Sequence, residues 1–183
     1  FSAVRAASIT EGKAIFDEDA KTVTVSGVTP YNEGSYVTVT IRKSGDAPIY
    51  FREMPAGEKG AFTFVSDMLD TDPTGTYNVY IGGGNLSAAS DSFVFINSTD
   101  NPLILEKISN ISDLETIKTN INYVETTYDI GLDEPLSLFD TNPAVKEQIY
   151  GAMLNRSFTD AYQIKPELFK SCVIALLNNG GTK

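Results

Sequence analysis

Three aspartates share one acidic segment, Asp67-Met68-Leu69-Asp70-Thr71-Asp72. Calcium binds roughly six to eight hard oxygen ligands, which clustered carboxylates and backbone carbonyls can supply. The segment lacks the glycine and the terminal bidentate glutamate of an EF-hand loop, and Asp is also a common turn residue. Two interpretations therefore stay open: a calcium site formed by Asp67, Asp70 and Asp72, and a solvated turn.

Three tyrosines could stack on sugar rings. In three segments with alternating apolar residues, one set of side chains is expected to face a core: Val37, Val39, Ile41, Ile49, Phe51, Tyr77, Val79 and Ile81. Tyr36, Tyr50 and Tyr80 then point outward. We expect a binding platform completed by Arg42, Arg52 and Asn78, whose polar groups can meet sugar hydroxyls. The same rings could instead pack under another part of the chain or form cross-strand pairs. The chain has no Trp, the residue with the largest stacking face.

The composition excludes several chemistries. The sequence has no His, so neither a Ser-His-Asp triad nor a His-based zinc or haem site can form. The single Cys172 lies in an apolar run, which predicts a buried and inert thiol. The net charge of −10 disfavours nucleic acid and anionic membrane surfaces as partners. No stretch approaches the roughly 20 apolar residues of a transmembrane helix. The start at Phe1 lacks a signal peptide, so we expect a mature or excised piece of a longer protein.

In the first half of the chain, apolar residues recur every second position, which is the period of a β-strand. Short alternating or apolar runs occur at 14–16, 21–28, 35–42, 48–53, 60–65, 76–81 and 92–96, and residues typical of turns separate them. About seven short strands at this spacing predict an immunoglobulin-like antiparallel β-sandwich over residues 10–98. Pro73-Thr74-Gly75-Thr76-Tyr77 opens the sixth strand, where such folds carry a tyrosine corner. We therefore expect Tyr77 to be a core residue.

In the second half of the chain, apolar residues recur every three or four positions, which is the period of an α-helix. Leu114, Ile117, Ile121, Val124 and Tyr128 recur three and four residues apart, and Ser112 with Glu115 has the spacing of a capping box. Asn142-Pro143 predicts the start of another helix, which buries Val145, Ile149 and Met153. Pro166 is expected to open a last helix that buries Phe169, Val173 and Leu176, and a shorter helical turn is expected after Pro135. These features predict a small all-α domain over residues 102–179, following the sandwich.

Both halves resemble modules of large surface and S-layer-anchored proteins of Gram-positive bacteria, which often accompany polysaccharide-degrading domains. In the first half the resemblance rests on 36–41, 60–64 and 73–83. In the second half it rests on 108–111, 129–132 and 145–159, which are similar to a helical repeat that follows such sandwiches. The resemblance implies an extracellular location beside enzymes or anchoring modules. It supplies no catalytic residues.

Three functions follow as hypotheses. The leading one is a non-catalytic accessory module that binds neutral polysaccharide, or acts as a spacer beside neighbouring modules of its own chain. The second is a structural or adhesive module that binds proteins. The third is a small polysaccharide hydrolase or lyase, because the 24 acidic residues offer many carboxylate pairs. No catalytic residue and no cofactor other than calcium are predicted.

Overall fold

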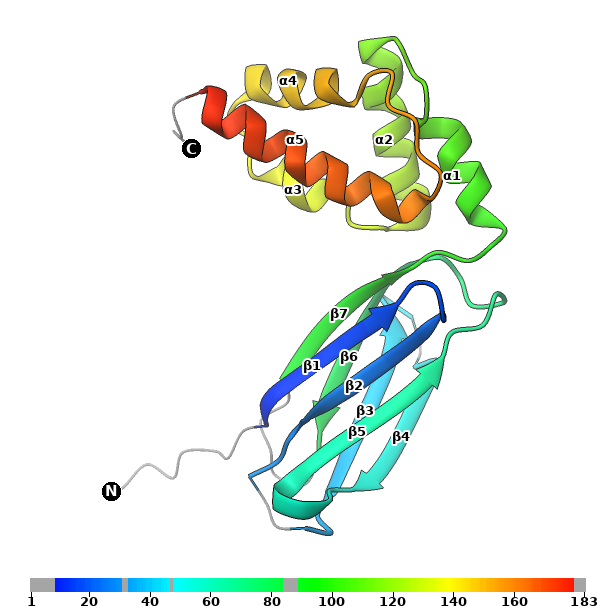
Figure 1. The fold of residues 1–183 in the computed structure, drawn as a ribbon, viewed down its shortest axis with the longest axis vertical. Coiled ribbons are helices and arrows are strands. Elements are labelled where there is room, and N and C mark those ends of the chain that lie inside the picture. The colour runs from blue at the N-terminus through cyan, green and yellow to red at the C-terminus, as the bar shows by residue number, and fades with distance from the viewer. Residues whose placement is uncertain (1–8, 31–32, 47, 84–88, 180–183) are drawn as a thin grey trace. The chain divides into compact units, whose positions relative to one another are not determined.

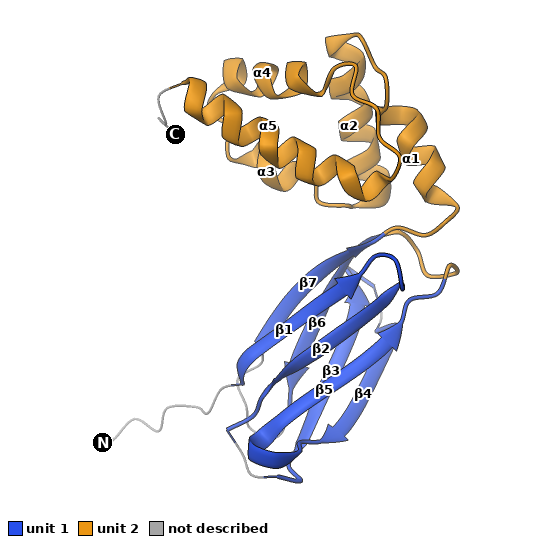
Figure 2. Cartoon of the chain, in the orientation of Figure 1, with its two compact units in different colours: residues 1–69, 75–95 blue, residues 70–74, 96–183 orange. Residues whose placement is uncertain are grey.

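The computed structural model describes residues 9–30, 33–46, 48–83 and 89–179, which form two compact units. One unit comprises Phe1–Leu69 and Gly75–Phe95, and the other comprises Asp70–Thr74 and Ile96–Lys183 (Figure 2). The division thus falls between Phe95 and Ile96, slightly before the expected one, and residues 70–74 belong to the second unit. Asn97 explains that grouping, because its backbone N–H donates to Thr74 Oγ1 (3.1 Å) and its side-chain amide donates to the Asp72 carbonyl (3.2 Å).

The first unit is an immunoglobulin-like sandwich of seven described strands in two antiparallel sheets, as predicted (Figure 1). One sheet has the order β1 (Thr10–Asp17), β2 (Thr22–Val28) and β5 (Ala61–Asp67). The other has the order β4 (Tyr50–Pro55), β3 (Tyr36–Lys43), β6 (Gly75–Gly82) and β7 (Ala89–Phe95). The third, fourth and sixth strands therefore lie side by side in one sheet, as the binding hypothesis required.

The core of the sandwich follows the predicted alternation in β2, β3 and β6. Its fully buried members from these strands are Val23, Val25, Val37, Val39, Ile41, Tyr77, Val79 and Ile81. Tyr77 stacks on Phe93 with ring centroids 5.5 Å apart and meets Phe95 edge-on at 6.2 Å. The prediction that Tyr77 is a core residue is confirmed. The hydroxyl hydrogen bond of a tyrosine corner stays a prediction.

The predicted phase of β4 is wrong. Tyr50 lies opposite Ile41 and packs against the core, whereas Phe51 lies opposite Thr40 and is 67% exposed. Ile49, also expected in the core, is 36% exposed. Three consecutive apolar or aromatic residues, Ile49, Tyr50 and Phe51, leave the alternation ambiguous, and pairing with β3 decides it. β4 is an edge strand, so the Phe51 side chain has side chains of a neighbouring strand on one side only.

The second unit consists of five described α-helices and a 3₁₀ turn. The helices are α1 (Asp100–Ile108), α2 (Leu114–Tyr128), α3 (Asp133–Ser137), α4 (Pro143–Met153) and α5 (Ile164–Asn178), and the turn η2 spans Ala161–Gln163. Asn142 caps α4 through its side chain and Pro143 is the first helical residue, as predicted. The capping residue of α2 is Asp113 and not Ser112, since the Asp113 carboxylate accepts the Thr116 N–H at 2.7 Å. Among the described helices, none is long and apolar enough to cross a membrane.

The helical core confirms the predicted faces of α2 and α4 and contradicts that of α5. Ile117, Ile121, Val124, Val145, Ile149 and Met153 are buried. In α5 the buried residues are Ile164, Leu168, Ser171, Cys172 and Ala175, while Phe169 and Val173 are 36% and 54% exposed. The helix also begins at Ile164, so Pro166 lies inside its first turn. Because α5 is apolar nearly all round, hydrophobic period does not fix its phase, and the small residues Ser171 and Ala175 allow close packing instead.

Cys172 is buried, as predicted. Its thiol lies 3.6 Å from the Pro135 carbonyl oxygen, and burial raises the pKa of the thiol to about 11. The sulfur is therefore protonated at neutral pH and a poor nucleophile.

Candidate functional site

The outer face of the four-stranded sheet gathers most of the predicted binding residues. We use this term for the side chains of β4, β3, β6 and β7 that point away from the sandwich core. Those nearest the candidate site are Phe51, Glu53, Tyr36, Thr38, Thr40, Arg42, Asn78, Tyr80, Ser90 and Ser92, and Pro55, Thr76 and Val94 lie on the same face toward its ends. All four strands pair directly with their neighbours, so the backbone beneath these side chains is held rigidly.

One cross-strand row of the outer face contains two aromatic residues. Phe51 pairs with Thr40, Thr40 pairs with Tyr80, and Tyr80 pairs with Ser90. Neighbouring strands are about 4.8 Å apart, so Phe51 and Tyr80 are separated by about 10 Å across the sheet. The small Thr40 lies between them. The row therefore presents two rings with a shallow gap between them.

Arg42 holds the Tyr80 ring. The guanidinium carbon lies 4.6 Å from the ring centroid, and one guanidinium N–H donates to the Tyr80 hydroxyl at 3.1 Å. A cation above the ring and a hydrogen bond to the hydroxyl restrict the side chain to one orientation. Arg42 in turn pairs with Asn78, which pairs with Ser92. The second row of the outer face is thus entirely polar.

A shallow depression of about 330 Å³ lies next to these rows. It is lined by Asn78, Tyr80, Ser90, Asp91 and Ser92. The Asp91 carboxylate accepts the N–H of Ala14 in β1 at 2.7 Å and that of Ser92 at 2.8 Å, so it mainly joins β7 to β1. Asn78, Ser90 and Ser92 bring amide and hydroxyl groups, which can both donate and accept hydrogen bonds. Such groups match the hydroxyls of a neutral sugar.

Four of the six predicted binding residues share the outer face, and two do not. Tyr36, Tyr80, Arg42 and Asn78 lie on it, although Tyr36 pairs with Pro55 four residues along β3 from Thr40. Tyr50 packs against the core, and Arg52, opposite Val39, follows the inward phase while reaching solvent at the sheet edge. The proposed trio Tyr36, Tyr50 and Tyr80 therefore does not form one platform.

Sequence reasoning missed three residues of the outer face. Phe51 was assigned to the core because the phase of β4 was inverted. Ser90 and Ser92 were not considered, although the buried Phe93 and Phe95 lie two residues apart in β7, so residues 90 and 92 fall in the opposite phase of the strand alternation. That alternation was the signal that places them opposite the core face.

The three aspartates of the calcium hypothesis do not assemble. Asp67 ends β5 and is exposed, whereas Asp70 accepts the Ser98 N–H at 3.2 Å. Asp72 is buried, and its backbone carbonyl accepts from Asn97. Within the described parts of the chain, no group of three or more Asp, Glu or Cys residues could hold a metal ion. The segment serves as a hydrogen-bonded turn.

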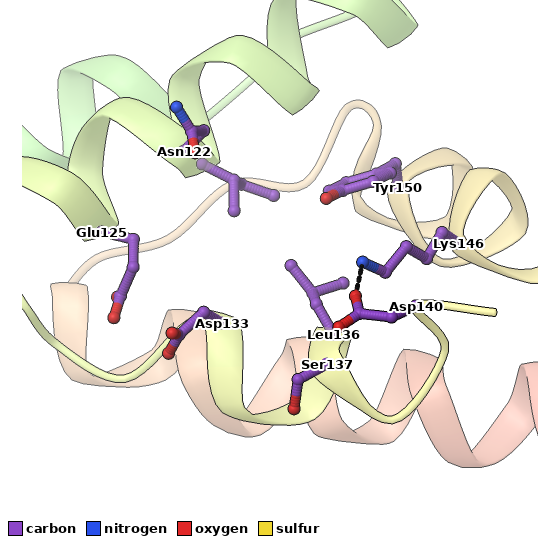
Figure 3. A pocket seen from close by; sticks show the side chains of 9 residues that line it. Asn122, Glu125, Asp133, Leu136, Ser137, Asp140, Lys146 and Tyr150 are labelled. Atoms are coloured by element: carbon purple, nitrogen blue, oxygen red, sulfur yellow. Dashed lines mark hydrogen bonds and ion pairs between the residues drawn. The ribbon is translucent and has the colours of Figure 1, made fainter. Parts of the chain in front are cut away.

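The helical unit has a pocket of about 260 Å³ between α2, α3 and α4 (Figure 3). Glu125 and Asp133 lie at one end, and the ion pair of Lys146 with Asp140 lies at the other (Figure 3). Burial, and then the neighbouring Asp133, raise the pKa of Glu125 to about 7. The Glu125 carboxylate accepts the Leu132 N–H at 2.7 Å and thereby closes the turn between α2 and α3. The contacts of Glu125 therefore give it a structural role.

Comparisons with known proteins add little. No protein-family model matches the chain. No curated protein matches it either. Among solved structures, the chain is similar to a DUF3244 family protein from Bacteroides vulgatus described as having an immunoglobulin-like β-sandwich fold. The identity is 15% and the TM-score 0.33, covering 49% of this chain and 99% of that one. A likeness of this degree carries no argument about function, and the assignment of the sandwich rests on its strand order.

Proposed function

We propose that this chain is a non-catalytic accessory module of an extracellular bacterial surface protein, and that it binds neutral polysaccharide on the outer face of the four-stranded sheet. The observation that carries the proposal is the row of Phe51 and Tyr80 beside the polar depression. The exposed ring of Phe51 and the partly exposed ring of Tyr80 on a rigid sheet can stack on the apolar faces of sugar rings, and neighbouring amide and hydroxyl groups can bind sugar hydroxyls.

The charge of the chain favours neutral over acidic polysaccharide. The protein carries a net charge of −10, so an anionic chain is repelled when it approaches within a Debye length. On the outer face, Arg42 is occupied by Tyr80, and Glu53 lies one row away from Phe51. Arg42 is therefore not a free cation for a sugar carboxylate, and Glu53 would repel one.

The extracellular and surface-associated location rests on the resemblance of 36–41, 60–64 and 73–83 to modules of S-layer-anchored Gram-positive proteins. The absence of His and the buried, protonated Cys172 support a non-catalytic role. Two further features agree with it. The depression on the outer face is shallow, and Asp91, the acidic residue that lines it, is engaged by two backbone N–H groups.

Affinity electrophoresis and calorimetry against a panel of neutral polysaccharides test the proposal. We expect Phe51→Ala, Tyr80→Ala and Asn78→Ala each to weaken binding about tenfold, which corresponds to about 1.4 kcal/mol for one contact. Tyr123→Ala is the matched control, because Tyr123 is a 47% exposed tyrosine on a helix of the other unit. Thermal unfolding of every variant checks that the sandwich remains folded.

Binding of the Phe51→Ala/Tyr80→Ala double variant at the affinity of the parent would reject the outer face as the site. If the parent binds no neutral polysaccharide, the second candidate, a structural or adhesive module, gains support. One observation favours that candidate: α5 exposes Phe169, Val173, Ile174 and Leu177, the last at 73%. Such side chains on one helix are typical of a surface that contacts protein.

A further inference from the structure

The edges of the two sheets are protected to different degrees. β4 carries Arg52, Glu53 and Pro55, and charged residues and proline discourage pairing with another chain. β1 and β7 are joined by the hydrogen bond from Ala14 to Asp91, and the register of β1 shifts between Thr10 and Lys13. β5, with the sequence AFTFVSD, has no Lys, Arg or Pro, and its one charged residue is the terminal Asp67. Among these edges, β5 is the least protected: the Ala61 carbonyl accepts the Gly57 N–H at 2.7 Å, but the residues that follow it carry no charge or proline before Asp67.

The backbone groups that β5 presents at its outer edge can be identified. At one end Thr29 N–H donates to the Gly60 carbonyl, and at the other Met68 N–H donates to the Lys21 carbonyl. Hydrogen-bonded pairs alternate along an antiparallel ladder, so the even-numbered residues of β5 bond to β2. The N–H and C=O groups of Thr63, Val65 and Asp67 therefore point away from β2. In the described part of the chain, no hydrogen bond to these groups is found.

We propose that β5 pairs antiparallel with β5 of a second copy of this chain, centred on Phe64. This register sets Thr63 of each copy opposite Val65 of the other, with both residues directing their hydrogen-bonding groups across the interface. The two Phe64 residues meet at the two-fold axis as a non-hydrogen-bonded pair, in which side chains approach most closely. The result is one continuous six-stranded sheet with an isologous interface.

The side chains at this edge fit a copy of themselves. Val65 is 58% exposed and would form a cross-strand pair of β-branched residues with Thr63 of the second copy. Antiparallel pairing also sets Asp67 opposite Ala61 of the second copy, next to the 3₁₀ turn Glu58–Gly60 that precedes the strand. Parallel pairing would instead put the two Asp67 carboxylates side by side. Glu58 and Lys59 in that turn offset each other's charge, so the preference for the antiparallel arrangement rests on keeping the two Asp67 carboxylates apart.

Sedimentation of the full-length chain at increasing concentration tests the proposal. We expect a monomer–dimer equilibrium that shifts toward dimer as salt rises, because salt screens the repulsion between two chains of net charge −10. Val65→Lys should weaken the dimer at least about tenfold, since lysine at an edge blocks strand addition. Thr63→Pro should do the same and leave β2–β5 pairing intact, because the N–H that it removes points outward.

Ile15→Lys is the matched control. Ile15 is 56% exposed on the solvent-facing side of the same sheet but lies in β1, the opposite edge strand, two strands away from β5, so its substitution should leave the dimer unchanged. Hydrogen exchange of the backbone amides tests the pairing register. The amides of Thr63 and Val65 should exchange fast at low protein concentration and slowly at high concentration. The amides of Phe62 and Phe64 should stay protected at both. A chain that remains monomeric up to millimolar concentration would overturn the proposal. A dimer that leaves the exchange of Thr63 and Val65 unchanged would overturn it as well.

Discussion

The stability of the helical unit should fall as the pH rises from about 4.5 to about 7, because of Glu125. Burial and the adjacent Asp133 raise the pKa of this side chain from 4.5 to about 7 in the folded state. The folded state therefore binds the proton more tightly than the unfolded state does. The stabilisation is fully present below about pH 4.5 and is lost progressively between about pH 4.5 and about pH 7.

The size of the effect follows from the same pKa. A pKa raised by this amount corresponds to roughly 3 kcal/mol between the two protonation states. Glu125 is only half-buried, so solvent screening reduces the contribution to about 1–2 kcal/mol. Glu125→Gln imitates the protonated carboxyl and keeps an oxygen that can accept the Leu132 N–H. We therefore expect this variant to match the parent at pH 4.5 and to be about 1–2 kcal/mol more stable at pH 8.

Urea unfolding followed by circular dichroism at 222 nm (a wavelength dominated by helix) measures this difference, since the described α-helices all lie in the second unit. Glu106→Gln, an exposed substitution on α1, is the control for the change of net charge. The comparison between variants removes the pH dependence contributed by the other carboxylates. If Glu125→Gln changes stability equally at pH 4.5 and pH 8, the raised pKa of Glu125 is refuted.

Two further predictions concern packing and capping. Tyr77→Ala should destabilise the sandwich by about 3–5 kcal/mol, because the side chain is fully buried between Phe93 and Phe95, whereas Tyr77→Phe should cost about 0.5–1.5 kcal/mol. Thermal unfolding measures both, and equal costs for the two variants would contradict a role for the buried ring. Asn142→Ala should destabilise the helical unit by about 1 kcal/mol, since the Asn142 side chain accepts the Val145 N–H at 3.3 Å. Asn142→Asp keeps a capping oxygen and should be nearly neutral. A similar loss of stability in both variants would contradict the capping role.

The outer face of the four-stranded sheet shows where sequence reasoning fails. The outward direction of Tyr80 and Asn78 was predicted correctly, because β6 alternates strictly and its inward residues are Tyr77, Val79 and Ile81. For Tyr50 and Phe51, the predicted inward and outward directions were the reverse of those observed. The reason is that β4 has adjacent apolar residues, and either phase of the strand buries an aromatic ring. The same ambiguity affected α5, which has apolar side chains on nearly every face. A pattern fixes orientation only where polar and apolar residues are clearly separated.

The sequence by itself determined the two-part organisation, the seven strands and the buried faces of α2 and α4, since all of these depend on local period and on turn or capping residues. Tertiary structure decided which strands became edges, which ring of β4 faces solvent, and which residues meet across strands. Those properties depend on pairing between segments far apart in the chain, such as Thr40 with Phe51 and with Tyr80. Tertiary structure also dispersed the three aspartates of the calcium hypothesis, because the Asn97 side-chain amide donates to the Asp72 carbonyl and the Ser98 N–H donates to the Asp70 carboxylate. Sequence proximity brings carboxylates near one another, but the folded chain sets the direction in which each one points.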